Sequence, residues 1–241
     1  MTQCTVSLAE QLDLKTLNQQ FETAHPKSIL MWCLENIEQG LIQSTAFGAG
    51  GMVLMDLLYQ DLNPFPPIPV VFLDTLHHFP ETLALAEQSR DRYHLDLRIY
   101  QPQGFQTRET FAARYGDALW EQDLHQYHQV TKVEPLQRAL QELGVTAWIT
   151  GRRRDQSETR TEMSIFEWDT QGRLKVNPLA AWTYKDIWRY IVENQVPYNL
   201  LYDQGYASIG DQPLTTMVKE GEHERAGRWR GTERLECGIH T

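Results

Sequence analysis

The sequence has few cysteines, and their arrangement excludes two common kinds of site. Its 241 residues include three cysteines, Cys4, Cys33 and Cys237. An odd number leaves no closed disulfide framework, and no Cys-x-x-Cys pair is present. The chain therefore lacks the sequence features of a structural zinc site and of an in-chain redox pair. Cys33 falls in an apolar stretch and is predicted to fill the core. Cys4 falls in a polar N-terminus, and we expect no function for it.

Long apolar runs and an excess of positive charge are also missing. No stretch approaches the roughly 18 apolar residues that span a bilayer. The first ten residues show no basic region followed by an apolar one, so we expect a cytoplasmic protein without a membrane partner. The net charge of −10 argues against nucleic-acid binding, because contacts to phosphates supply most of that affinity. A small anionic ligand would need a local basic cluster.

The sequence does contain alternating strand-like and helix-like segments. Strands are predicted at residues 41–47, 69–73, 95–100 and 146–150. Helices are predicted at residues 52–60, 80–93, 135–143 and after a capping box at residues 183–186. This order predicts an α/β fold, a twisted parallel sheet with helices on both faces. Ligands of such sheets bind beyond the carboxyl ends of the strands, where residues 44–51, 74–78 and 151–160 lie.

Two of these strand-end segments have the composition of an anion site. Residues 44–51 (STAFGAGG) place glycines before a helix, where backbone N–H groups and the helix dipole favour negative charge. They match neither a Walker A loop nor Gly-x-Gly-x-x-Gly, and a plain tight turn is the alternative. Residues 151–160 hold four arginines, which can donate paired hydrogen bonds to phosphate or sulfate. A solvated loop is the alternative there.

The third strand-end segment contains Asp74, Thr75, His77 and His78. Asp74 can bind a ribose hydroxyl or an adenine amine, or it can cap a helix. Adjacent histidines on a loop point in different directions, and no zinc-type carboxylate spacing accompanies them. We therefore predict no metal site.

Cys237 is the cysteine with a candidate function. Arg225, Arg228, Arg230 and Arg234 precede it, and nearby positive charge favours the nucleophilic thiolate. Residues 205–241 are rich in glycine and in charges of both signs. We predict that they form a mobile segment that brings Cys237 to a site and releases it again. A disordered tail without a function is the alternative.

Eight segments, in order along the chain, resemble the 3′-phosphoadenosine 5′-phosphosulfate (PAPS) reductases of sulfate assimilation. They are residues 45–48 (TAFG), 73–82 (LDTLHHFPET), 114–121 (RYGDALWE), 132–135 (KVEP), 151–156 (GRRRDQ), 208–211 (SIGD), 224–229 (ERAGRW) and 236–240 (ECGIH). The last of these is highly specific. The resemblance implies the adenine-nucleotide α-hydrolase-like (PP-loop type) fold. It divides the chain into a nucleotide-binding reductase domain, residues 1–204 with a helical segment at 1–40, and the mobile catalytic segment 205–241. It also implies a homodimer.

The resemblance implies a two-step reaction. The Cys237 thiolate would attack the sulfur of PAPS, release adenosine 3′,5′-bisphosphate and carry an S-sulfonate. Reduced thioredoxin or glutaredoxin would then release sulfite, so no tightly bound cofactor is expected. Lys132, Arg225 and Arg228 would surround the reacting sulfate. His240 would either orient the thiol or serve only as a contact of the tail.

The resemblance also assigns residues to the bound nucleotide. Asp74 and Thr75 would lie beside the adenosine. The phosphate region would be bound by the glycine-rich loop, through Ser44, Thr45, Phe47, Gly48, Gly50 and Gly51. The remaining phosphates, including the 3′-phosphate, would be bound by arginines from Arg152, Arg153, Arg154 and Arg160.

One departure from related sequences bears on the substrate. Bacterial-type adenosine 5′-phosphosulfate (APS) reductases carry a Cys-Cys pair before Lys-Val-Glu-Pro and a Cys-x-x-Cys after Ser-Ile-Gly, which hold a [4Fe–4S] cluster. Tyr127, His128, Asp211 and Leu214 occupy those positions here. We therefore expect no iron–sulfur cluster and PAPS as the substrate.

Three alternatives stay open. The first is a cluster-free APS reductase. The second is an ATP pyrophosphatase or adenylyltransferase on the same fold, which would need a Ser-Gly-Gly-x-Asp-Ser loop that this chain lacks. The third is a non-catalytic nucleotide-binding protein, which would tolerate loss of Cys237.

Overall fold

A six-stranded sheet forms the centre of the protein, in a computed structural model that describes residues 12–230 and 238–239. The strand order is β3-β2-β1-β4-β6-β5, and all neighbours are parallel except β5, which runs antiparallel to β6. The strands are β1 (Leu41–Thr45), β2 (Val70–Leu73), β3 (Leu97–Tyr100), β4 (Ala147–Ile149), β5 (Phe166–Trp168) and β6 (Leu174–Val176). The predicted α/β class with a parallel sheet is confirmed.

Side chains alternate between the two faces of the sheet, and each face has its own core. In β2, Val70 and Phe72 belong to the larger apolar cluster, whereas Val71 and Leu73 belong to a smaller one. The same alternation separates Leu41 from its neighbour in β1. Both faces are therefore buried and must be covered by helices.

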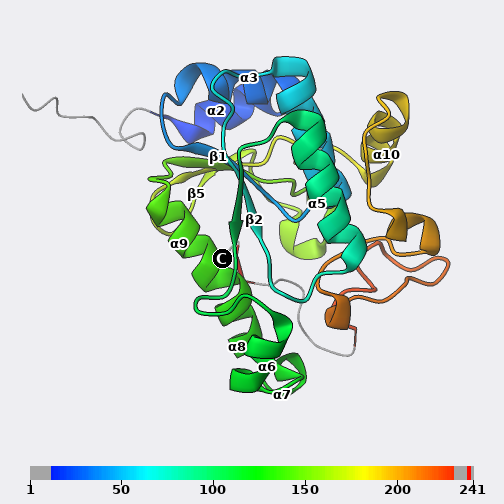
Figure 1. Cartoon of the computed structure of the whole chain (residues 1–241). Helices are drawn as coiled ribbons and strands as arrows, with labels where there is room; N and C mark the ends of the chain where they lie inside the picture. The colour runs from blue at the N-terminus through cyan, green and yellow to red at the C-terminus, as the bar shows by residue number, and fades with distance from the viewer. Residues whose placement is uncertain (1–11, 231–237, 240–241) are drawn as a thin grey trace, which may run out of the picture.

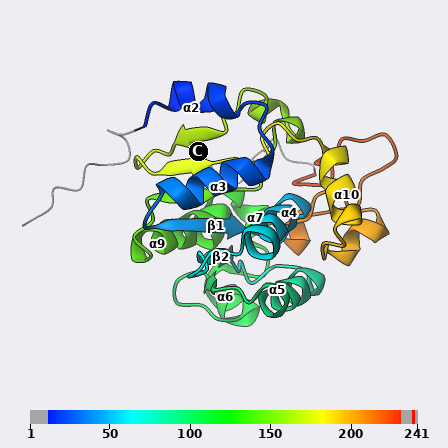
Figure 2. The ribbon, with the colours of Figure 1, turned by 90° about the horizontal axis from the view of Figure 1, so that it is seen from above.

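Helices from different parts of the chain cover these faces. The smaller cluster lies under α9 (Glu134–Glu142). The larger cluster lies under α3 (Pro26–Asn36), α4 (Ala49–Asp56), α5 (Pro80–Tyr93) and α10 (Tyr184–Glu193). Figure 1 shows α9 and α5 on opposite sides of the central strands, and in Figure 2 α9 and α4 flank β1.

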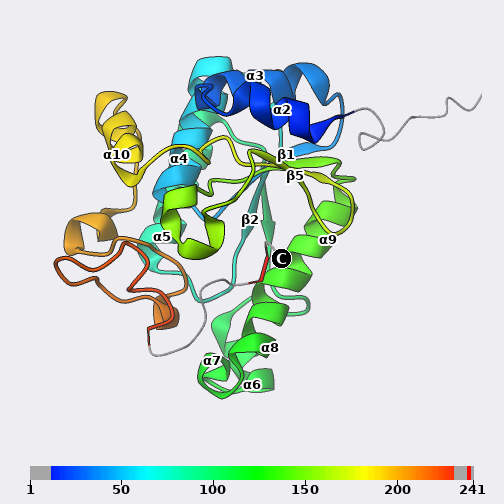
Figure 3. The same ribbon diagram turned by 180° about the vertical axis from the view of Figure 1, so that it is seen from behind.

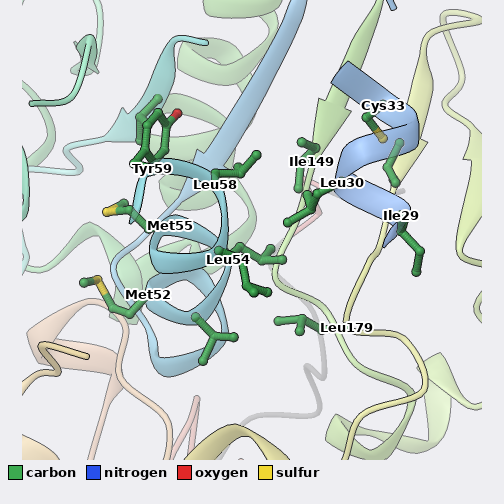
Figure 4. Close-up of a cluster of buried hydrophobic side chains, with 14 of the residues drawn as sticks. Ile29, Leu30, Cys33, Met52, Leu54, Met55, Leu58, Tyr59, Ile149 and Leu179 are labelled. Atoms are coloured by element: carbon green, nitrogen blue, oxygen red, sulfur yellow. The ribbon is translucent and has the colours of Figure 1, made fainter. Parts of the chain in front are cut away.

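The larger cluster includes the cysteine predicted to be buried. Cys33 is fully buried on α3, and burial strongly raises the pKa of its thiol. In Figure 4, Leu54 and Leu58 point toward Leu30 and Ile149. The cluster thus joins α3 and α4 to the middle of the sheet, and Cys33 is a core residue as predicted.

The remaining described elements are short. α2 (Leu14–Phe21) lies against β5, where the Asn18 amide exchanges two hydrogen bonds, of 2.8 and 2.9 Å, with the Phe166 backbone. The Asn18 side chain thereby provides hydrogen-bond partners for backbone groups at the edge of the sheet. The other elements are η1 (Leu57–Leu62), α6 (Arg108–Tyr115), α7 (Leu119–Gln122), α8 (Leu124–His128), η2 (Gln129–Val133), η3 (Arg154–Gln156), η4 (Glu158–Arg160), η5 (Leu200–Gln204) and η6 (Gln212–Leu214).

Most elements predicted from the sequence are present, with shifted ends. The helix predicted at 52–60 begins at Ala49 and continues as the π-helix η1. The predicted capping box of α10 is present, with Thr183 and Asp186 bonded reciprocally. The β5–β6 hairpin was not predicted. No helix within the described ranges is long and apolar enough to cross a bilayer. The division into residues 1–204 and 205–241 stays a prediction.

Candidate active site

A cleft of about 230 Å³ lies at the carboxyl ends of β1, β2 and β4. It is the place where a parallel sheet of this kind binds its ligand. All three strand-end segments singled out from the sequence reach it. The predicted site residues that line it are Ser44, Thr45, Gly48, Gly50, Gly51, Thr75, Lys132, Arg152, Arg153, Arg160, Arg225 and Arg228.

Glycines let two strand-end loops touch through their backbones. A Cβ on Gly50 would lie 2.7 Å from the Gly151 carbonyl oxygen, and one on Gly51 would lie 2.4 Å from Thr45 Oγ1. A side chain at Gly50 would therefore separate the loop after β1 from the loop after β4, whereas one at Gly51 would clash with the end of β1. At the start of α4, Gly48 provides no side-chain cap. The helix N-terminus thus opens into the cleft, as the sequence predicts for an anion site.

A tyrosine from a distant element completes this loop. The Ala49 backbone N–H donates a hydrogen bond of 3.2 Å to the hydroxyl of Tyr202 in η5. Burial raises the pKa of Tyr202 to about 12, so the hydroxyl stays protonated near neutral pH. No role was predicted for Tyr202, because nothing in the local sequence shows that η5 meets the glycine-rich loop.

The arginines after β4 are already held by partners. Arg152 pairs with Glu167 and donates to Asn177 Oδ1 at 3.2 Å. Arg153 is buried and pairs at 2.8 Å with both Asp155 and Glu224. Such pairing fixes a guanidinium in place while its remaining N–H groups can face a ligand. Glu224 also lines the cleft.

Glu224 and Arg160 are two further charged residues of this region that are largely buried. Burial raises the pKa of Glu224, and the ion pair with Arg153 only partly offsets this. Arg160 is buried too, and it bonds to the side chain of Gln156. The loop after β4 is therefore a built network rather than a solvated charge run.

Three residues predicted to bind substrate lie outside the lining of the cleft. Phe47 is buried with φ of 54° and packs edge-on against Phe72 at 5.1 Å. Asp74 accepts hydrogen bonds from the Leu76 N–H and the Gln101 side chain, at 2.9 and 2.8 Å.

Arg154 is the third predicted substrate-binding residue that lies outside the lining of the cleft. It donates to the Met163 carbonyl at 2.8 Å and pairs with Glu22 of the segment after α2 at 2.5 Å. Phe47, Asp74 and Arg154 thus each have a structural partner away from the cleft.

A buried ion pair lies at the wall of the cleft. Lys132 Nζ is 2.5 Å from Asp211 Oδ2, and their side chains are 10% and 1% exposed. Thr75 Oγ1 donates to the other carboxylate oxygen at 2.8 Å. Burial alone would raise the pKa of Asp211, but the Lys132 ammonium, together with His78 and Thr75, holds it well below its ordinary value. Asp211 therefore carries a full negative charge near neutral pH.

Arg228 offers positive charge to the cleft. Its guanidinium stacks on Trp229 at 4.6 Å and donates to the Ile209 carbonyl at 3.3 Å. Among the described residues it has no carboxylate partner, and its Nε has no hydrogen-bond partner. Arg225 lies over the same indole at 5.3 Å. Together they provide cationic N–H donors on one wall of the cleft.

Ile239 is a described residue near the C-terminal end that reaches the cleft. Cys237 and His240 lie outside the described residues, and so does Cys4. Ile239 lines the cleft and packs against the apolar cluster under α9. A Cβ on Gly238 would lie 3.8 Å from Val133, the residue after Lys132. Figure 3 shows this short red segment beside α9.

Each of the two histidines after β2 has one ring nitrogen beside a backbone carbonyl, and His78 also lines the cleft. His77 is buried among aromatic rings, and its Nδ1 lies 2.7 Å from the Thr75 carbonyl oxygen. Burial lowers the pKa of His77. His78 Nε2 lies 2.9 Å from the Leu73 carbonyl oxygen. In the part of the chain that is described, no three metal-ligating side chains are grouped.

The positions that carry cluster ligands in APS reductases come together here. Tyr127 lies at the centre of a small apolar cluster, and Leu214 packs against it. Burial, with the Asp211 charge as a further cause, raises the pKa of Tyr127 well above its ordinary value. His128 stacks edge-on against Trp229 at 5.9 Å. None of these side chains supplies a thiolate, so the residues present do not fit an iron–sulfur cluster.

These features define an α/β protein with a mostly parallel sheet and an arginine-lined cleft at the carboxyl ends of its strands. The profile of the phosphoadenosine phosphosulfate reductase domain family matches residues 40–217. The chain is 48% identical over 229 residues to the phosphoadenosine phosphosulfate reductase of Emericella nidulans, covering 94% of this chain and 74% of that one. It therefore belongs to the phosphoadenosine phosphosulfate reductase family, as the sequence resemblance implied.

Other relatives bear on the substrate and on the fold. The chain is 40% identical over 232 residues to the adenosine 5′-phosphosulfate reductase of Halalkalibacterium halodurans, covering 95% and 97% of the two chains. The crystal structure of the PAPS reductase from Candida auris, a phosphate complex, matches with a TM-score of 0.78 at 39% identity, covering 88% and 99%. The FMN adenylyltransferase of Candida glabrata matches with a TM-score of 0.60 at 18% identity, covering 92% and 75%, which shows a shared fold alone.

Proposed function

We propose that this protein reduces PAPS to sulfite and adenosine 3′,5′-bisphosphate, with Cys237 as the nucleophile and thioredoxin as the electron donor. One observation carries the proposal. Lys132, Arg225 and Arg228 line the same cleft as Ile239, which lies two residues after Cys237 in the chain. An activated sulfate and a cysteine would thus meet where positive charge is concentrated.

The first step is a sulfonate transfer. The Cys237 thiolate attacks the sulfur of PAPS, an S–S bond forms, and the bond from sulfur to the bridging phosphate oxygen breaks. The electron pair leaves with adenosine 3′,5′-bisphosphate, and Cys237 becomes an S-sulfonate. Lys132 and Arg228 offset the negative charge on the sulfonate and on the departing phosphate.

The second step is a reduction by another protein. A thioredoxin thiolate attacks the Cys237 sulfur, and sulfite leaves with the S–S electron pair. The second thioredoxin thiol resolves the mixed disulfide, which returns Cys237 to the thiolate and leaves thioredoxin oxidised. Glutaredoxin could supply the same two thiols. A cytoplasmic homodimer remains part of the proposal.

PAPS rather than APS is the proposed substrate. Support comes from the positions of Tyr127, His128, Asp211 and Leu214, which carry cluster ligands in bacterial-type APS reductases and no cysteine here. The relatives bear both names, so the two substrates must be compared directly.

The test is sulfite release with reduced thioredoxin, supplying PAPS in one assay and APS in another. We expect sulfite from PAPS, and an S-sulfonate on Cys237 when thioredoxin is omitted. Cys237→Ser should abolish sulfite formation and keep binding of adenosine 3′,5′-bisphosphate, whereas Cys4→Ser should keep both. Turnover by Cys237→Ser would overturn the mechanism. Sulfite mainly from APS would keep the mechanism and overturn the substrate.

A further inference from the structure

Asp211 places a negative charge in a cleft whose proposed ligand is an anion. It lines the cleft, and its relative exposure is 0%. A charge there opposes anion binding through space and costs desolvation on its own. Since Asp211 nonetheless stays ionised, its role must come from the groups that it contacts.

Several contacts from different elements fix the position of Asp211. Thr75, at the end of β2, donates to Asp211 Oδ1 at 2.8 Å. The residue also forms an antiparallel bridge with His78, and the next N–H, of Gln212, donates to the His77 carbonyl at 2.7 Å. Thr215 Oγ1 donates to the Asp211 carbonyl at 2.8 Å. The carboxylate is therefore held in one orientation by residues 75–78 and by its own turn.

Among the described residues, its partner Lys132 has a single ion pair. Lys132 lies near the end of the π-helix η2, and its ammonium ends a flexible four-carbon chain. In the part of the chain that is described, the ion pair at 2.5 Å with Asp211 is what holds this ammonium by charge. Lys132 and Asp211 line the same cleft as Arg228.

We infer that Asp211 is a positioning residue, which holds the Lys132 ammonium at the place where it meets the sulfonate. The inference rests on the proposed function. Catalysis by charge depends on donors that are oriented before the reaction begins, because reorienting them during the step costs part of the gain. Asp211 thus acts on the reaction only through Lys132, and its own charge need not touch the substrate.

A double-mutant cycle on the first step tests this inference. The enzyme is mixed with saturating PAPS without thioredoxin, and the rate of Cys237 S-sulfonation is followed by mass spectrometry of the intact protein. Asp211→Asn keeps the shape of the side chain and should lower this rate roughly 10- to 100-fold, the range expected for a misplaced catalytic group. In a Lys132→Met background, Asp211→Asn should cause no further loss.

A second variant and a control guard against general structural damage. Thr75→Val removes the hydroxyl that donates to Asp211 Oδ1 and accepts from the His77 N–H, so it should lower the rate less, and its effect should shrink in the Lys132→Met background. Asp169→Asn breaks another ion pair, the half-buried one with Arg173 at 2.7 Å, in the β5–β6 turn outside the cleft. It should leave S-sulfonation unchanged. Circular dichroism verifies that each variant is folded.

The outcomes separate the inference from the proposed function. No S-sulfonate on the wild-type protein, or full turnover by Cys237→Ser, would overturn both. S-sulfonation at the wild-type rate by Asp211→Asn would overturn the inference alone. An equal loss from Asp211→Asn with Lys132 present or absent would also overturn it, since Asp211 would then act independently.

Discussion

At the scale of single residues, the charge on Asp211 is kept by its neighbours against the cost of burial. Burial is the largest influence on its pKa and raises it. Lys132, His78 and the Thr75 hydroxyl act in the opposite direction and prevail, so the pKa lies below the ordinary value of 3.8. A group whose pKa is lower in the folded than in the unfolded state stabilises the fold when ionised.

This lowered pKa predicts an acid-dependent stability. The contribution of the carboxylate is present above the unfolded pKa and is lost as pH falls from about 4 toward the folded pKa. Asp211→Asn leaves Lys132 buried without its partner and should lower the free energy of unfolding by ~3 kcal/mol near neutral pH. The difference in the free energy of unfolding between wild type and Asp211→Asn should become smaller below about pH 4.

Urea unfolding at a series of pH values measures the difference in the free energy of unfolding between wild type and Asp211→Asn. Asp91→Asn is a suitable control, because the Asp91 side chain is 76% exposed and its loss should change the free energy of unfolding little at any pH. A gap for Asp211→Asn that stays constant from neutral to acid pH would contradict the argument.

Much of the cleft lining could be predicted from the sequence, because glycines and arginines at strand ends have the composition of an anion site. It could not predict which arginine faces outward. The side chains of Arg152 and Arg153 line the cleft, whereas that of Arg154 points away from it toward Glu22, which is 132 positions away in the sequence. Asp211 was noticed within a family motif, but its pairing with Lys132 depends on two distant segments meeting.

At the scale of elements, the contact between the loops after β1 and β4 determines the shape of the cleft. Gly50→Ala would place a methyl group 2.7 Å from the Gly151 carbonyl oxygen, a backbone atom that cannot rotate away. We expect a loss of about 1–3 kcal/mol in the free energy of unfolding, typical of overpacking, together with weaker nucleotide binding.

Gly48→Ala is the matched variant for stability. Its added Cβ would lie 3.9 Å from the Tyr202 hydroxyl, which is an ordinary contact. Thermal and urea unfolding of both variants should separate them, with Gly48→Ala close to wild type. Equal stability of the two variants would show that the loops can move apart freely.

The length and the apolar composition of each element explain why some elements could be predicted and others could not. β2 is a run of apolar residues, buried on both faces, and α5 begins at a proline and ends at the predicted residue. The β5–β6 hairpin has strands of three residues, with Glu167 and Lys175 paired in register. Such short strands with charged residues have no clear periodicity, and only tertiary contacts stabilise them.

At the scale of the whole molecule, the protein has a net charge of −10, but its cleft is lined by Lys132, Arg225 and Arg228. The overall field repels an anionic nucleotide, whereas the cleft attracts it at short range. Salt screens both effects, with a Debye length of about 10 Å at 0.1 M and about 3 Å at 1 M. Only contacts within the cleft are short enough to give net attraction to a bound phosphate.

This balance makes the stabilisation of the protein by a bound nucleotide sensitive to salt. Adenosine 3′,5′-bisphosphate at about 100 times its Kd should raise the free energy of unfolding by ~2.7 kcal/mol at low salt. At fixed ligand concentration, this gain should shrink as salt increases, because the ion contacts in the cleft weaken. Arg228→Ala should reduce both the gain and its dependence on salt.

Arg189→Ala removes the same amount of charge from the exposed surface of α10 and should behave as wild type, since Arg189 pairs only with Asp186 among its described contacts. Titrations followed by thermal unfolding at several salt concentrations compare the three proteins. If Arg189→Ala and Arg228→Ala changed the salt dependence equally, net charge rather than the cleft would govern binding. A larger effect at Arg228 would instead show that an acidic protein can concentrate its affinity for an anion in a few arginines held at one sheet edge.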